Sequence, residues 1–253
     1  ILKALNLIIF FMLIDVHTHV TDVAFDKDRK EVIERSGCAV IINNGSNPED
    51  NRATLKLAEE FENVKAALGL YPGDVAKMEP KAIENEINFI SGEKPIAIGE
   101  IGLDGTYDNM EKQVKYFRHL VSLAMKKDVP VLVHTRKAEK EVIDILEEMK
   151  AKKVVLHCFC GKLKLAERAE KLGYYMSVPP FVVYASHFQE LVKRISITKL
   201  LTETDAPYLG PFKDKRNEPG NVTFTIKKIA ELKGMDEEEV EKSIYMNYQK
   251  LFV

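Results

Sequence analysis

Two histidines separated by one residue, His17 and His19, follow a short apolar segment that begins at Leu13. Residues two apart in an extended strand point to the same side, so both imidazoles are able to bind one cation. Taken alone, the spacing is equally compatible with two histidines that have ordinary structural roles. A metal site therefore needs further ligands from elsewhere in the chain.

Glu100 is a carboxylate inside an apolar segment, with Gly99 before it and Gly102 shortly after it. A buried carboxylate requires a cation or hydrogen-bond donors. A salt bridge to a nearby lysine or arginine is the alternative. We favour a metal, because the glycines leave room for close approach and the other candidate ligands are histidines. Glu100 is then a candidate to bridge two ions.

His134 and His157 each form the polar end of an apolar, strand-like segment. One such histidine is more often structural. Two of them at the ends of neighbouring strands, together with Glu100, predict a second metal site.

Asp205 supplies the last candidate ligand, for the first ion, and is able to orient or deprotonate a bound water. Glu203 lies two residues earlier, on the same side of an extended chain, and competes for this role. One of the two is expected to bind metal and the other to support a ligand or act as general base. We therefore predict catalytic roles for Glu100, Glu203 and Asp205.

Several basic residues are candidates for binding substrate. Arg136 follows His134 closely, and its guanidinium suits bidentate binding of a phosphate, although a salt bridge at a helix start is the alternative. Lys215 and Arg216 form a small basic patch in a later loop, which is otherwise explained as a solvated turn. We assign Arg136 and Arg216 to substrate binding.

The elements that must position these residues form a repeated pattern. Short apolar, β-branched segments alternate with longer amphipathic ones, as in repeated βα units. Strands are predicted over 13–16, 39–42, 64–68, 96–98, 131–133, 154–156, 174–177 and 199–202. Helices are predicted between them over 28–36, 48–61, 80–90, 110–127, 138–150, 162–172 and 184–194, and two more, over 222–233 and 237–248, follow the last strand. The pattern predicts a single (β/α)8 TIM-type barrel with extra C-terminal helices, whose active face lies at the carboxyl ends of the strands. The candidate metal ligands all fall there: His17, His19, Glu100, His134, His157 and Asp205.

Composition narrows the function classes. The chain has 253 residues, 45% of them hydrophobic, which suits one domain with a large core. Lys and Arg number 37 against 39 Asp and Glu, so any nucleic acid must be bound locally rather than through a general basic excess.

The three cysteines include the pair Cys158 and Cys160, expected to be packing residues rather than a disulfide, which favours a cytoplasmic location. The apolar residues 1–11 are too short to span a membrane and are expected to be an N-terminal extension of a barrel over 12–253.

Several motifs occur in the order that is typical of one enzyme family. They are Asp-Val-His-Thr-His at 15–19, Gly-Glu-Ile-Gly-Leu-Asp at 99–104, His-Thr-Arg at 134–136, His-Cys-Phe-Cys-Gly at 157–161, Glu-Thr-Asp-Ala-Pro-Tyr at 203–208 and Arg-Asn-Glu-Pro at 216–219. In these the chain resembles the TatD-like metal-dependent deoxyribonucleases of the amidohydrolase superfamily, over about 12–252. The resemblance implies a distorted barrel, two divalent ions and exonuclease activity on DNA. It places the same six residues in the ligand positions.

The chain departs from the family pattern at 69–72, where Tyr71 stands in place of a common histidine. The departure concerns substrate contacts rather than metal ligands, and we assign Tyr71 to substrate binding. The aromatic pair that commonly follows the Gly-Leu-Asp motif is altered as well.

We therefore expect a two-metal hydrolase acting on nucleic acid, most simply DNA, with no obligate protein partner. Magnesium is favoured by the resemblance and by phosphodiester chemistry, whereas ligation rich in histidine also suits zinc or manganese. One alternative is an ester or amide hydrolase, such as an aminoacyl-tRNA deacylase, because the same ligands serve attack on a carbonyl. Another is a non-catalytic nucleic-acid-binding barrel, against which the complete set of ligands argues.

Overall fold

A computed structural model describes residues 12–253, and its centre is one sheet of eight parallel strands in chain order. The strands are β1 (Leu13–Thr18), β2 (Cys38–Asn44), β3 (Val64–Leu68), β4 (Ala97–Asp104), β5 (Val131–Arg136), β6 (Val154–Leu156), β7 (Tyr175–Val178) and β8 (Leu200–Thr202). Beyond the last strand, the amide of Asp205 donates to His17 O of β1 at 2.8 Å. The sheet is thus a nearly closed barrel, and the prediction of a distorted (β/α)8 barrel is confirmed. The expected extension over 1–11 lies outside the described residues.

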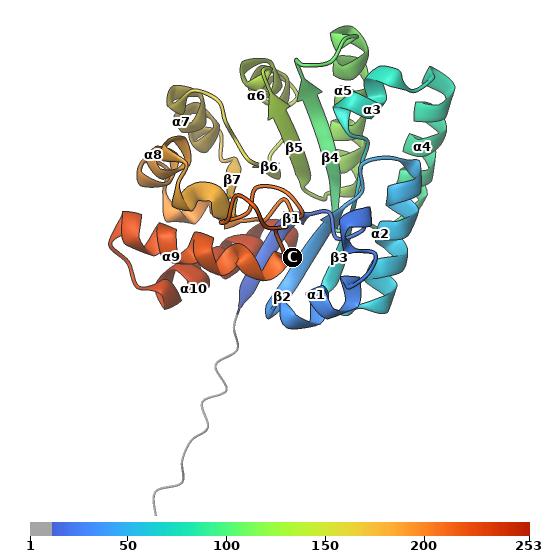
Figure 1. The fold of residues 1–253 in the computed structure, drawn as a ribbon. Helices are drawn as coiled ribbons and strands as arrows, with labels where there is room; N and C mark the ends of the chain where they lie inside the picture. The colour runs from blue at the N-terminus through green and yellow to red at the C-terminus, as the bar shows by residue number, and fades with distance from the viewer. Residues whose placement is uncertain (1–11) are drawn as a thin grey trace, which may run out of the picture.

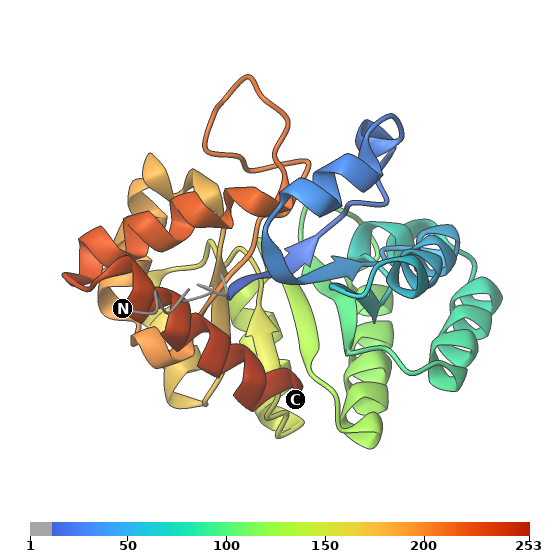
Figure 2. The same ribbon diagram turned by 90° about the horizontal axis from the view of Figure 1, so that it is seen from below.

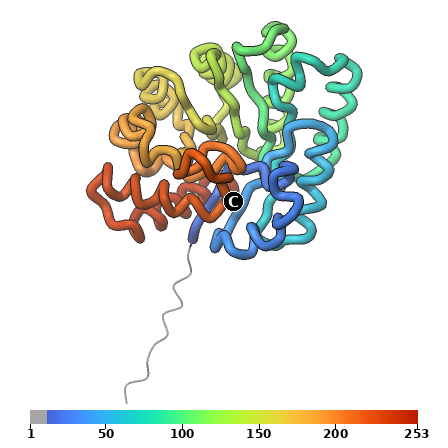
Figure 3. Tube along the Cα trace, in the orientation of Figure 1, coloured from blue at the N-terminus to red at the C-terminus, as the bar shows by residue number. Residues whose placement is uncertain are grey.

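Helices surround the sheet, and the chain travels once around it (Figures 1 and 3). They are α1 (Arg29–Arg35), α2 (Pro48–Glu60), α3 (Pro72–Lys77), α4 (Pro80–Gly92), α5 (Met110–Lys127), α6 (Glu139–Glu148), α7 (Leu163–Lys171), α8 (Ser186–Arg194), α9 (Val222–Lys233) and α10 (Glu237–Phe252). Short 3-10 turns occur at η1 (Val23–Phe25), η2 (Pro180–Val183), η3 (Ile197–Lys199) and η4 (Pro219–Asn221). In the described part of the chain, no helix is long and apolar enough to cross a membrane.

Local sequence explains where several helices begin. The Asn47 side chain accepts from the amides of Glu49 and Asp50 at the start of α2, and Pro48 occupies its first turn. Asp236 and Glu239 form a capping box at the start of α10. These contacts satisfy amides that have no partner within the helix and fix the helix boundaries.

The barrel interior is apolar along most of the strands and polar at their carboxyl ends. All eight residues of β4 are buried, including Glu100 and Asp104. Gly102 lies so close to β5 that an added Cβ would be 2.0 Å from His134 O, and its φ of +153° disfavours other residues. The glycine therefore lets a strand that carries carboxylates pack against one that carries a histidine.

Candidate metal centre

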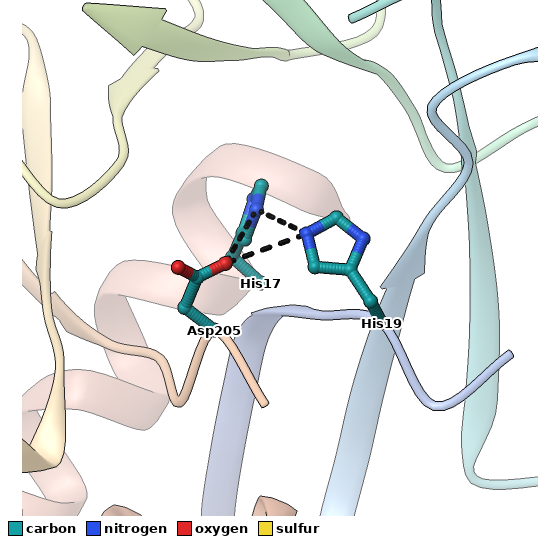
Figure 4. Close-up of side chains that lie close together, drawn as sticks. All are labelled: His17, His19 and Asp205. Carbon is teal, nitrogen blue, oxygen red and sulfur yellow. Dashed lines mark hydrogen bonds and ion pairs between the residues drawn. The ribbon is translucent and has the colours of Figure 1, made fainter. Parts of the chain in front are cut away.

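Four of the predicted ligands, from β1, β4 and the segment after β8, converge on one point. His17 Nε2 lies 3.2 Å from His19 Nε2 and 3.5 Å from Asp205 Oδ1, and His19 Nε2 is 3.4 Å from the same carboxylate oxygen (Figure 4). Glu100 Oε2 lies 3.8 Å from His17 Nε2 and 3.6 Å from His19 Nε2. Five of the six distances among these four donor atoms thus lie between 3.2 and 3.8 Å, close to the edge of about 3.5 Å of a tetrahedron whose centre is about 2.1 Å from each corner, a normal distance from zinc or magnesium to its ligands. The spacing of these donor atoms fits a divalent cation.

The remaining two predicted ligands meet the other oxygen of Glu100. Glu100 Oε1 is 2.9 Å from His134 Nδ1 and 3.0 Å from His157 Nε2, and these two nitrogens are 3.3 Å apart. The carboxylate therefore presents one oxygen to each group of histidines. This arrangement fits two ions with Glu100 between them.

The His134 ring is oriented by a carboxylate that sequence reasoning missed. Asp104 Oδ2 lies 3.2 Å from His134 Nε2 and accepts a 2.9 Å hydrogen bond from the Tyr71 hydroxyl. The amide of Thr106 donates to Asp104 Oδ1 at 2.8 Å. Burial raises the pKa of Asp104, but hydrogen bonds from His134, Thr106 and Tyr71 outweigh it and hold the pKa below its ordinary value. An ionised Asp104 fixes the ring so that Nδ1 faces Glu100. The sequence signal for Asp104 was its position four residues after Glu100, which places both carboxylates on the same face of an extended strand.

Glu203 supports the opposite histidine. Its carboxylate is fully buried, accepts from the amide of Cys158 at 2.9 Å and from the Ser177 hydroxyl, and lies 3.7 Å from His157 Nδ1. Burial raises the pKa of Glu203. Asp205, in contrast, lines the open cavity, and its side chain is 15% exposed. Of the two carboxylates, Asp205 is the one that can reach a water or substrate there.

The backbone of Asp205 is held in an uncommon conformation. Its φ is +55°, and its amide donates to His17 O. The fully buried Asp15 accepts from the Thr204 amide at 2.9 Å, which joins β1 to the segment after β8. On the other side, His19 Nδ1 lies 3.0 Å from Asn44 O. These contacts hold the backbone of His17 and Asp205 and the ring of His19.

The charges of the centre are strongly coupled. Burial lowers the pKa of His19, but Asp205 and Glu100 outweigh it and raise the pKa to about 9. Burial opposes ionisation of Glu100, yet His157 and His134 hold its pKa well below the ordinary value. A cation that binds here would displace the protons of these histidines, which leaves neutral imidazoles around an ionised carboxylate, a donor set that divalent metals accept.

The predicted substrate contacts differ in position. Arg136 and Tyr71 line a cavity of about 960 Å³ above the metal ligands. Arg216 does not line it; its guanidinium binds Asp28 at 2.7 Å and Glu218 at 2.9 Å. Cys160 is exposed and lines the cavity, so the prediction that it is a packing residue is wrong.

The chain is similar to known metal-dependent hydrolases and deoxyribonucleases. A family model described as TatD related DNase matches residues 14–253. Human deoxyribonuclease TATDN3 is 33% identical, with 95% of this chain and 94% of that protein covered. An uncharacterized metal-dependent hydrolase of Methanocaldococcus jannaschii is 36% identical, with 94% of this chain and 96% of that protein covered. The 3'-5' ssDNA/RNA exonuclease TatD of Shigella flexneri is 28% identical, with 94% of this chain and 98% of that protein covered.

Among solved structures, the YjjV protein of Escherichia coli, a TatD homologue, superposes with a TM-score of 0.89 at 29% identity, covering 96% of this chain and 98% of that one. A TatD family hydrolase of Entamoeba histolytica has a TM-score of 0.84 at 21% identity, with 95% of this chain and 98% of that chain covered. The second likeness concerns the fold alone.

Proposed function

This chain belongs to the TatD-related DNase family of metal-dependent hydrolases, and we propose that it hydrolyses phosphodiester bonds in DNA with two divalent ions. The observation that carries the proposal is the division of Glu100, with Oε2 among His17, His19 and Asp205, and Oε1 between His134 and His157. Two divalent ions held by these residues would act together on the attacking and leaving oxygens of a phosphodiester.

The donors also bear on the identity of the ions. Four imidazoles suit zinc or manganese, whereas the carboxylates and the proposed substrate favour magnesium. We propose magnesium as the ion that supports turnover. When bound, the ions would lower the pKa of a water and neutralise charge that develops on phosphate oxygens.

The residues of the chain have separate roles in this proposal. Asp205 lies at the cavity wall and takes the proton from the attacking water. Arg136 lines the same cavity, makes no ion pair with any of residues 12–253, and binds phosphate oxygens. Asp104 and Glu203 keep the rings of His134 and His157 directed at Glu100.

The test is cleavage of a labelled single-stranded DNA by protein stripped with EDTA, with magnesium, manganese or zinc added back. We expect metal-restored cleavage in the parent and a loss of roughly 100-fold or more in Asp205→Ala, a usual size for removing a group that transfers a proton. Equal cleavage by parent and Asp205→Ala would refute the role of Asp205. Turnover of a small carboxylic ester without cleavage of DNA would instead favour attack on carbonyl carbon.

A further inference from the structure

The two halves of the cavity wall differ in charge. Loops and helices after β1, β2 and β3 contribute four carboxylates, Asp22, Glu49, Asp50 and Asp74. The ends of β5 to β8 and the segments after them contribute the candidate ligands His134, His157 and Asp205, one arginine, Arg136, and otherwise uncharged side chains such as Phe181 and Tyr208. A polyanion is repelled by the first half and has its favourable path over the second half.

The second half continues into a group of exposed aromatic rings. Tyr208, Tyr184 and Phe212 have relative exposures of 57%, 48% and 48%, and every aromatic residue among the exposed large hydrophobics of residues 12–253 belongs to this group. Tyr208 lines the cavity itself. The Tyr184 hydroxyl donates to Gly210 O at 2.9 Å, which joins the segment after β7 to the loop after β8. That loop stands out from the body of the barrel between β8 and α9 (Figure 2).

Lysines accompany these rings. Lys213 Nζ lies 5.9 Å from the centre of the Tyr184 ring, and Lys215 Nζ lies 5.2 Å from that of Phe212. Neither lysine forms an ion pair with a described residue. Rings with free ammonium groups beside them match the two parts of a nucleic-acid strand, since bases stack on rings and phosphates attract cations.

The backbone of Tyr208 is joined directly to the metal centre. The amide of Tyr208 donates to Asp205 O at 2.8 Å, and its carbonyl accepts from the buried Asn217 side chain at 2.6 Å. A ring held three residues from a metal ligand is well placed to contact a nucleotide next to the one being cleaved.

We propose that Tyr208, Tyr184 and Phe212, with Lys213 and Lys215, form a subsite for unpaired bases of a single-stranded nucleic acid. The strand leaves the metal centre over the loops after β7 and β8, and Tyr208, whose hydroxyl donates to Asp22 Oδ2 at 3.5 Å, lies at its border with the acidic wall. The inference rests on the proposed nuclease function, because it takes the scissile phosphate to lie at the metal centre. Stacking does not depend on base identity, so the subsite selects single strands rather than a sequence.

The test compares two substrates in the magnesium-loaded protein: a single-stranded oligonucleotide of about ten nucleotides, and methyl p-nitrophenyl phosphate, a diester whose only ring is the leaving group and which has no neighbouring base to stack. The variant is Tyr208→Ala/Phe212→Ala. We expect its kcat/KM for the oligonucleotide to fall about tenfold or more, mainly through KM, and to fall much less for the small diester. The aromatic exchange Tyr208→Phe/Phe212→Tyr should retain oligonucleotide turnover, and Met125→Ala/Met246→Ala, which removes exposed side chains elsewhere, should match the parent.

Equal losses on both substrates, or none on either, would overturn the subsite. Binding of a labelled phosphorothioate oligonucleotide, measured by anisotropy, separates this proposal from the nuclease assignment. A parent that binds single strands more tightly than duplex, and loses that preference in Tyr208→Ala/Phe212→Ala, supports the subsite even without cleavage. A parent that cleaves DNA while the variant keeps its affinity and KM retains the function and loses the subsite.

Discussion

At the scale of single residues, Glu100 has the most demanding position. Its carboxylate contacts nitrogens of His17, His19, His134 and His157, and its side chain is only 6% exposed. A side chain with only one ligating oxygen cannot serve both groups of histidines. A glutamine, for example, offers a carbonyl oxygen to one group and an amide NH₂ to the other. In the proposed two-ion arrangement, the second metal position therefore depends on the negative charge and the two oxygens of Glu100.

Tyr71 replaces a histidine that is common in the family, and its hydroxyl is directed at Asp104 rather than at the cavity centre. Burial, followed by the Asp104 carboxylate, raises the pKa of the phenol, so it stays a donor. In Tyr71→Phe we expect metal affinity at the His134 position to fall severalfold, and in Asp104→Asn by roughly 10- to 100-fold. Calorimetric titration with manganese measures both. Unchanged metal affinity with a raised KM for DNA would show instead that Tyr71 acts on substrate.

At the scale of elements, apolar runs located all eight strands but ended several of them too early. β1 continues to Thr18, β4 to Asp104 and β5 to Arg136, beyond the predicted ends at 16, 98 and 133. The carboxyl ends are where polar ligands replace apolar residues, so hydrophobicity fails at the site itself. Asp104 was missed for this reason. The short helix α3 (Pro72–Lys77) was also missed, because a six-residue helix has too few residues to show a period.

The packing of β4 on β5 predicts the effect of a glycine substitution. An alanine Cβ at Gly102 would meet His134 O at 2.0 Å, and the backbone at this position is unfavourable for any side chain. We expect Gly102→Ala to lower the free energy of unfolding by about 1–3 kcal/mol and to weaken metal binding at His134. Urea unfolding checks the first effect. Gly92→Ala is the matched control, because its Cβ would meet nothing within 4 Å at the end of α4, and it should be neutral or slightly stabilising. Equal stability of the two variants would contradict the packing argument.

At the scale of the whole molecule, the metal centre joins the first strand, the middle of the barrel and the segment after the last strand. His17 comes from β1, Glu100 from β4, and Asp205 from the chain that completes the barrel. Cations bound there would link these three parts of the barrel. Binding to the folded state alone must raise its stability.

We therefore expect metal removal to lower the melting temperature. At a metal concentration near 100 times Kd, the gain is about 2.7 kcal/mol, or roughly 5–10 °C for a chain of this size. Differential scanning calorimetry with EDTA and with added magnesium or manganese measures it. His134→Ala should show a smaller metal-dependent shift than the parent, and an identical shift would mean that the ions stabilise some other site.

The most direct test of the two-ion centre is anomalous diffraction from crystals soaked in manganese, with Glu100→Gln crystals as the comparison. The parent should show two ions, one beside Glu100 Oε2 with His17, His19 and Asp205, and one beside Oε1 with His134 and His157. Glu100→Gln should lose at least one of them. A single ion in the parent, or two ions that do not share Glu100, would contradict the account.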